Sequence, residues 1–238
     1  MIYQKTKTNP YYWLILVFLI LCSINLSAEF FHQRWLIYLS KPLLVSILSI
    51  YFYLNAPNNF FSRYLLLGFI FSVGGDTLLM FNENASGGQL FFIFGLSSFL
   101  VAHLMYLIAF MIFPEREKGI LYQKPWLFLF FLFYLIGNIL FLWPHLPEVI
   151  DIAVVIYCIC IIGMATAAFN LWNRVERSIL IWLLLGVILF VISDSLIALN
   201  KFTPFAAYIP LPRLSIMITY LASQLLICLT GIQLAKYI

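Results

Sequence analysis

Eight apolar segments, each of about 20 residues, constrain the fold of this chain more than any other feature. A helix needs about 20 apolar residues to cross the ~30 Å hydrocarbon core of a bilayer. The segments cover residues 11–27, 35–54, 64–81, 90–113, 126–142, 152–171, 179–199 and 214–235. Turn and helix-breaking residues separate them at 55–59, 86–88, 114, 144–147 and 204–212. We therefore expect an all-α, polytopic membrane bundle with eight transmembrane helices.

Composition supports this class. Hydrophobic residues make up 64% of the 238 residues and charged residues only 9%, whereas soluble domains carry about 25% charged residues. The spans and their short loops fill the chain, so we expect a single transmembrane domain over residues 1–238. The net charge of +4 comes from basic residues scattered at span ends. It reflects membrane topology and does not indicate nucleic-acid binding.

The first span has two interpretations. Lys5 and Lys7 precede it, as in a signal peptide, but the residues around Ala28 form a poor small-x-small cleavage site. Because seven further spans follow, we interpret it as an uncleaved first helix.

The loops set the expected orientation. One side carries most of the basic residues, and cytoplasmic loops are enriched in Lys and Arg. On that side lie Lys5, Lys7, Arg63, Arg116, Lys118, Lys124, Arg174, Arg177 and Lys236, against Arg34, Lys201 and Arg213 on the other. Both termini are therefore expected in the cytoplasm, and the expected location is a bacterial inner membrane.

Two carboxyl groups lie inside apolar spans. Asp76 ends the sequence Ser-Val-Gly-Gly-Asp, and Asp194 lies in Val-Ile-Ser-Asp-Ser. An Asp at the centre of a membrane helix costs roughly 2.5–3.5 kcal/mol on insertion scales, so a role is expected. Each lies five residues from the outer end of its predicted span, in one layer with Lys41 and below Lys201 and Arg213. Two roles stay open: proton chemistry, or a structural pair with Lys41, since buried ion pairs are poor evidence of stabilisation.

Other polar residues share helix faces with glycines and aromatics. Positions i, i+4 and i+8 lie on one face, and small residues there let a neighbouring helix approach closely. The series are Gly68, Ser72 and Asp76; Gly95, Phe99 and His103, followed by Tyr106; Gly186, Phe190 and Asp194; and the pair Tyr220 and Gln224. A histidine in mid-membrane indicates function. Ser72, Tyr220 and Gln224 are equally explained by interhelical hydrogen bonds that hold the bundle together.

The third and seventh spans resemble each other. Asp-Thr-Leu-Leu at residues 76–79 matches Asp-Ser-Leu-Ile at 194–197, four spans apart and in helices of the same direction. This pattern is typical of a parallel duplication of a four-helix unit.

The sequence lacks the motifs of disulfide frameworks, metal sites and serine hydrolases. The cysteines at 22, 158, 160 and 228 all lie in apolar spans and are interpreted as core residues, not as a disulfide framework or a metal pair. His32 and His145 lie in loops at span ends, so no metal or cofactor is expected. A serine hydrolase based on Ser72 or Ser193 with His103 would lack the Gly-x-Ser-x-Gly elbow.

Taken together, the motifs resemble the YhhN-like lysoplasmalogenase family, in order and from the second span onward. They are Lys41-Pro42, Ser72-x-x-Gly75-Asp76, Gly95-x3-Phe99-x3-His103-x2-Tyr106, Gly186-x3-Phe190-x2-Ser193-Asp194, Asn200-Lys201-Phe202 and Tyr220-x3-Gln224. The resemblance implies an eight-span membrane protein that hydrolyses the vinyl ether bond of lysoplasmalogens. The implied products are a fatty aldehyde and glycerophospho-ethanolamine or -choline, and the implied partner is a lysophospholipid.

The residues suit this chemistry. Protonation of the vinyl β-carbon leaves an oxocarbenium ion, as in glycoside hydrolysis, where two carboxyl groups divide the work. Burial and mutual repulsion would keep one Asp protonated, while Lys41 would keep the other ionised. His103 and Tyr106 are expected to relay the proton or hold the leaving oxygen, and Lys201 and Arg213 to hold the phosphate. Substrate binding is assigned to Lys41, Ser72, Ser193, Asn200, Lys201, Arg213, Tyr220 and Gln224.

A second function, from another class, also fits. Paired membrane carboxyl groups and a four-plus-four repeat are found in proton-coupled carriers of lipids or small metabolites. Which Asp is the acid, and the oligomeric state, stay open at this point.

Overall fold

The computed structural model describes residues 10–81, 88–114 and 118–238. Its regular secondary structure is entirely helical in these ranges, with helices α1 (Tyr12–Phe30), α2 (Arg34–Asn55), α3 (Phe60–Met80), α4 (Gly88–Met111), α5 (Ile120–Gln123), α6 (Phe128–Leu142), α7 (Asp151–Phe169), α8 (Arg177–Phe202) and α9 (Pro212–Ala235). Short 3-10 turns η1 (Pro125–Leu127) and η2 (Trp143–His145) extend α6, and η3 (Pro204–Tyr208) follows α8. Within the described residues, eight helical segments are long and apolar enough to span a membrane, which confirms the predicted class.

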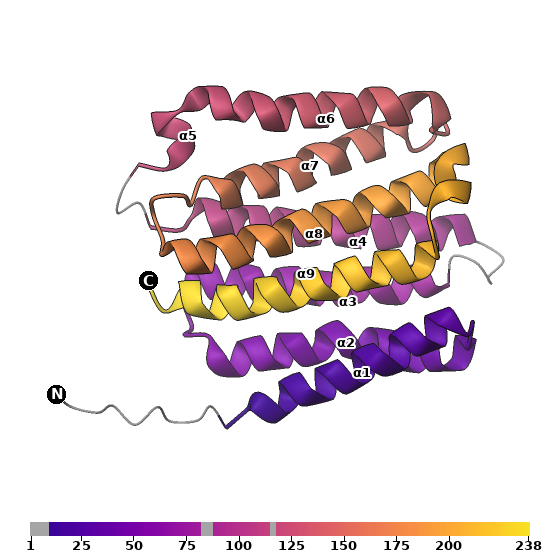
Figure 1. Ribbon diagram of the computed structural model, residues 1–238, viewed down its shortest axis with the longest axis horizontal. Helices are drawn as coiled ribbons and strands as arrows, with labels where there is room; N and C mark the ends of the chain where they lie inside the picture. The colour runs from indigo at the N-terminus through magenta and orange to yellow at the C-terminus, as the bar shows by residue number, and fades with distance from the viewer. Residues whose placement is uncertain (1–9, 82–87, 115–117) are drawn as a thin grey trace.

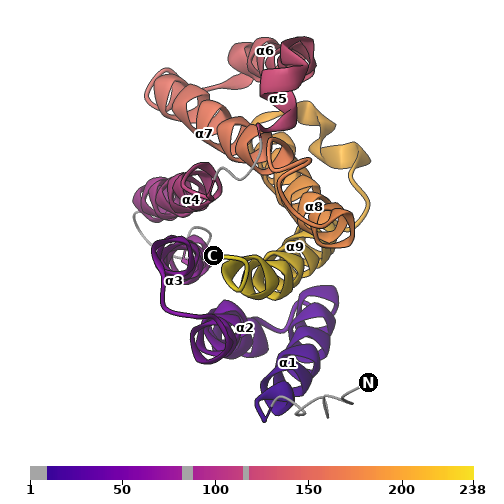
Figure 2. The ribbon, with the colours of Figure 1, turned by 90° about the vertical axis from the view of Figure 1, so that its left-hand side faces the viewer.

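Six helices form a closed ring seen along the bundle axis, in the order α2, α3, α4, α7, α8 and α9 (Figure 2). Helix α1 packs outside this ring against α2 and α9, and α6 lies outside it against α7. Helix α9 is the most extensively buried span and α6 the least. The interior of the ring is filled by large aromatic side chains, including Phe69, Tyr106 and Phe190.

Close approach between α3 and α4 depends on two glycines. A Cβ added to Gly68 would lie 2.2 Å from Cε1 of Tyr106, and one added to Gly75 would lie 2.4 Å from Cδ2 of Phe99. Both rings are buried and have no space to retreat. The small residues on the Asp76 face therefore serve the close helix packing that their spacing indicates.

Local chemistry explains several helix boundaries. Asn59 begins α3 by accepting a hydrogen bond from the Ser62 amide at 2.9 Å. Pro212 occupies the first turn of α9, where its missing N–H costs nothing. Pro42 lies inside α2, directly after Lys41. Its carbonyl accepts a hydrogen bond from the Ser46 hydroxyl at 2.7 Å.

The connections sort to two ends of the bundle (Figure 1). The α1–α2 and α8–α9 connections lie at one end, called the α8–α9 end below, while the start of α1 and the C-terminus lie at the other. Helix α8 continues to Phe202, beyond the predicted end at residue 199. Asp194 is therefore followed by about two helical turns and Asp76 by about one. The shared layer of the two carboxyl groups stays a prediction.

Two predictions stay open. The cytoplasmic orientation of the termini and the four-helix duplication remain predictions. Of the residues used to predict topology, Lys5, Lys7 and Arg116 lie outside the described residues, as do Ser86 and Gly87 of one predicted break.

Candidate active site

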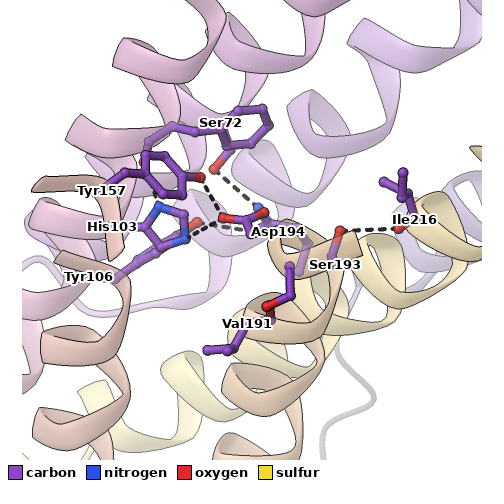
Figure 3. A network of polar contacts seen from close by, with 11 residues as sticks. Ser72, His103, Tyr106, Tyr157, Val191, Ser193, Asp194 and Ile216 are labelled. Atoms are coloured by element: carbon purple, nitrogen blue, oxygen red, sulfur yellow. Dashed lines mark hydrogen bonds and ion pairs between the residues drawn. The ribbon is translucent and has the colours of Figure 1, made fainter. Parts of the chain in front are cut away.

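Asp194 meets groups from two other helices inside the ring (Figure 3). The Tyr157 hydroxyl of α7 donates a hydrogen bond to Oδ2 of Asp194. Nε2 of His103, from α4, lies 3.3 Å from the same oxygen. His103 is completely buried, and its side chain reaches Asp194. We call Asp194, His103 and Tyr157 the acid cluster.

The surroundings of His103 determine where its proton lies. Nδ1 is 2.7 Å from the Phe99 carbonyl oxygen, which can only accept, so Nδ1 carries a hydrogen. Nε2 of a neutral imidazole then presents a lone pair to the Asp194 carboxyl group. Nε2 is buried and has no hydrogen-bond partner among the described residues, and its contact with Asp194 is not aligned as a regular hydrogen bond. Attraction across this contact requires one shared proton, either on the carboxyl group or on the imidazole.

Asp76 has different neighbours. Its Oδ2 accepts a hydrogen bond of 2.7 Å from the Tyr220 hydroxyl of α9. Lys41 of α2 attracts it electrostatically, and Asp76 and Asp194 also interact through their charges. One turn below, Gln224 donates to the Ser72 hydroxyl and accepts from the Tyr106 hydroxyl, both at 3.1 Å. The hydrogen bonds around Asp76 thus join α3, α4 and α9.

Aromatic rings lie between the two carboxyl groups. The ring centroid of Phe190 is 4.5 Å from that of His103 and 5.7 Å from that of Tyr220. Phe99 stands edge-on to Tyr220, with ring centroids 5.8 Å apart. The phenol that holds Asp76 and the imidazole that faces Asp194 therefore both contact Phe190. Each carboxyl group has its own set of hydrogen-bonding partners.

Asp194 lines an apolar pocket between α4, α6, α7 and α8. Tyr157 and Phe99 line it beside Asp194, and Tyr134, Asn138 and Ser195 add a few polar groups. The Ser195 hydroxyl donates to the Val191 carbonyl at 2.7 Å and lies 3.3 Å from the Tyr134 hydroxyl. The rest of the wall is aliphatic or aromatic. This is the character of a site for a long hydrocarbon chain.

A second pocket lies at the α8–α9 end. Its lining carries four basic side chains and one carboxylate, and we call it the basic pocket. The polar lining consists of Glu29, Arg34, Tyr38, Lys41, Asn200, Lys201 and Arg213. Leu79, Phe92 and Ile197 line both pockets, so the two adjoin. The Lys201 ammonium lies 4.9 Å from the centre of the Phe92 ring, at this junction.

The predicted site residues divide into two groups. Lys41, Asn200, Lys201 and Arg213 are brought together in the basic pocket. The other predicted residues are buried and line neither this pocket nor the apolar one, with Asp194 the exception. They are Ser72, Asp76, His103, Tyr106, Ser193, Tyr220 and Gln224. Ser193 donates to the Ile216 carbonyl at 3.2 Å, which ties α8 to α9 (Figure 3).

Three residues of the site were missed in the sequence. Tyr157 gives one signal that was available, because a tyrosine deep in an apolar span needs a partner for its hydroxyl. Glu29 lies beyond the predicted end of the first span at residue 27, and only the structure shows that it is in the last turn of α1 and 6% exposed. In the sequence, Arg34 indicates only topology, because it lies at a span end. It becomes a site residue when α1 and α2 fold against α9.

Metal ligation has no basis in the described residues. None of their His, Cys, Asp or Glu side chains form a group of three that is able to hold an ion. The four cysteines are free and dispersed.

The fold and the site define a polytopic membrane protein with a carboxyl group in the wall of an apolar pocket. The chain belongs to the YhhN family, whose model matches residues 36–231. This confirms the resemblance seen in the sequence motifs.

Two curated relatives are similar to most of the chain. Lysoplasmalogenase TMEM86A of Bos taurus is 31% identical over 173 residues, which cover 71% of this chain and 65% of the relative. Lysoplasmalogenase TMEM86B of Sus scrofa is 33% identical over 166 residues, covering 69% and 62%. The chain thus matches slightly less than two thirds of the length of each relative. No solved structure matches it.

Proposed function

We propose that this protein is a membrane hydrolase that cleaves the vinyl ether bond of lysoplasmalogens. The products are a fatty aldehyde and glycerophospho-ethanolamine or -choline. Two relatives named lysoplasmalogenase support the reaction class. The observation that carries the proposal is the junction of the two pockets: a carboxyl group opens on an apolar cavity that adjoins a cavity lined by four cations.

The two pockets match the two parts of such a lipid. The phosphate would lie among Arg34, Lys41, Lys201 and Arg213, because cationic side chains bind phosphate strongly. The hydrocarbon chain would enter the apolar pocket past Phe92 and Ile197, which line both cavities. The vinyl ether joins the glycerol to the chain, so it would lie near Asp194. Glu29 supplies a carboxylate for the ammonium of an ethanolamine or choline head group.

Asp194 is the proposed proton donor. It lines the apolar pocket, and the proton that it shares with His103 is available at the pocket wall. Transfer of this proton to the β-carbon of the vinyl ether leaves an oxocarbenium ion at the α-carbon. Water adds to the α-carbon and returns a proton to the Asp194–His103 pair. The hemiacetal then collapses to aldehyde and alcohol, and no further reactant is consumed.

Asp76 is the proposed stabiliser of positive charge. The Tyr220 hydroxyl donates to its Oδ2 and Lys41 attracts it, which offsets part of the cost of burying a carboxylate. A negative charge behind Phe190 and Phe99 would stabilise the cation through a medium of low dielectric constant, where charges interact strongly. Tyr106, Gln224 and Ser72 would fix the geometry of this side without touching the substrate.

Aldehyde release by the purified protein in detergent tests the proposal. Alkenyl and acyl lysolipids are supplied side by side, and the alkenyl substrate alone is expected to yield aldehyde. The Asp194→Asn variant is expected to purify normally and to lose this activity. A carrier, in contrast, would show activity only as transport across sealed vesicles. Release of no aldehyde in detergent, together with transport in vesicles, would contradict the enzyme proposal.

A further inference from the structure

A third cavity lies between α4, α6 and α7 on the side of the apolar pocket away from the basic pocket. We call it the distal groove. Its walls are mostly apolar, with the small residues Gly163 and Ala167 on α7 and Leu107 and Met111 on α4. No part of the proposed chemistry uses it.

The distal groove continues the apolar pocket. Leu135 of α6 and Ile162 of α7 line both cavities. Along α7, the lining of the apolar pocket ends at Ile162, and the lining of the groove runs from Ile159 to Asn170 on one helix face. At 1.5 Å per residue, the path from Tyr157 to Asn170 rises about 20 Å. A lipid chain in one leaflet extends over roughly half of the ~30 Å hydrocarbon core, about 15 Å. The two cavities together are long enough for such a chain beyond Asp194.

The groove stays open because its floor carries small residues. A Cβ added at Gly163 would lie 3.5 Å from Cδ2 of Leu107, an ordinary van der Waals contact. One methyl group therefore fits, whereas a leucine or phenylalanine side chain at this position would take up space that now belongs to the groove. Helix α6, which forms the opposite wall, is the most loosely buried span.

We propose that the distal groove holds the terminal carbons of the substrate chain, and that Gly163 and Ala167 set the longest chain that the site accepts. This inference rests on the proposed function, because it places the reacting end of the chain at Asp194. It adds a specificity that neither the acid cluster nor the basic pocket determines.

Binding of uncleavable lipids tests the inference separately from catalysis. Octyl and octadecyl ether lysophosphatidylcholines lack the vinyl double bond, so their Kd values can be measured in one detergent without turnover. In Gly163→Leu the preference for octadecyl over octyl is expected to fall about tenfold, since the added side chain would occupy the space of the terminal carbons. Ala167→Phe should act in the same direction. Leucine favours a helix more than glycine, so Gly163→Leu does not weaken α7 itself.

Gly137→Leu is the matched control. Gly137 lies on α6, and a Cβ added there meets nothing within 4 Å. It lines neither the apolar pocket nor the distal groove. The Gly137→Leu variant should keep the chain-length preference of the wild type. An unchanged preference in both Gly163→Leu and Ala167→Phe would overturn the inference and leave the groove to bulk membrane lipid. Failure of the proposed function would instead appear as absent aldehyde release by the wild type.

Discussion

The two membrane carboxyl groups lie in similar sequence settings but in different surroundings. Asp76 is held by Tyr220 between tightly packed helices and lines neither of the two pockets. Asp194 is held by Tyr157, faces His103 and forms part of a cavity wall. The comparison shows that an Asp in an apolar span signals function, while the packing of neighbouring helices decides which function is open to it.

Packing density explains the difference. Around Asp76, Gly75 brings α3 so close to α4 that the Phe99 ring fills the intervening space. Around Asp194, α6 packs outside the ring and leaves an apolar cavity against α7 and α8. A substrate chain can therefore reach Asp194, but it can affect Asp76 only through the intervening aromatic rings.

The largest expected effect is that of Asp194→Asn. Asparagine keeps the size of the side chain but cannot donate the proton, and general acid catalysis contributes about 10²–10⁴-fold. The kcat for aldehyde release should fall by this factor, while the protein still inserts and purifies. Glu176→Gln, which removes an exposed carboxylate at the opposite end of α8, is the control and should leave kcat unchanged. Retained turnover in Asp194→Asn would exclude Asp194 as the acid.

Asp76→Asn should have a smaller effect, with kcat lowered about tenfold, because a charge that acts through aromatic rings contributes less than the ~100-fold of a group in contact. The double variant should be little worse than Asp194→Asn alone, since residues that act as a unit are not additive. Steady-state kinetics of the three variants would provide the test. A larger loss in Asp76→Asn than in Asp194→Asn would reverse the two roles.

Lys201→Ala and Arg213→Ala test the basic pocket. Both side chains would bind the phosphate, which is remote from the reacting bond, so KM should rise more than kcat falls. The rise is expected to be about tenfold for each, equivalent to ~1.4 kcal/mol of a charge-assisted hydrogen bond. A KM equal to that of the wild type in both variants would show that the phosphate does not bind in this pocket.

Glu29→Gln should produce the smallest change, and one of selectivity. Without the carboxylate, lysolipids with an ammonium head group should bind about threefold more weakly, as for the loss of a partly solvated ion pair. Lysophosphatidic acid, which lacks the ammonium, should bind equally well or better. Competition assays with both lipids would measure the ratio. An equal loss for both would show that Glu29 only maintains the structure around the cations.

Much of the architecture follows from the sequence because the bilayer imposes it. Length and hydropathy determine the spans, since backbone groups in hydrocarbon must bond within a helix. Helical spacing also places Gly68, Ser72 and Asp76 on one face, and the family motifs select the residues of interest. These properties are local to a single span.

The tertiary structure decided which faces meet. The packing of α7 against α8 brings Tyr157 to Asp194, and the packing of α4 brings His103 to the same carboxyl group. Ser193 precedes Asp194 in the motif but turns toward α9, away from the apolar pocket. Such contacts arise between helices far apart in the chain, and their register depends on side-chain volumes from both partners. No periodicity within one span encodes them, because each span is free to rotate about its own axis until its neighbours pack against it.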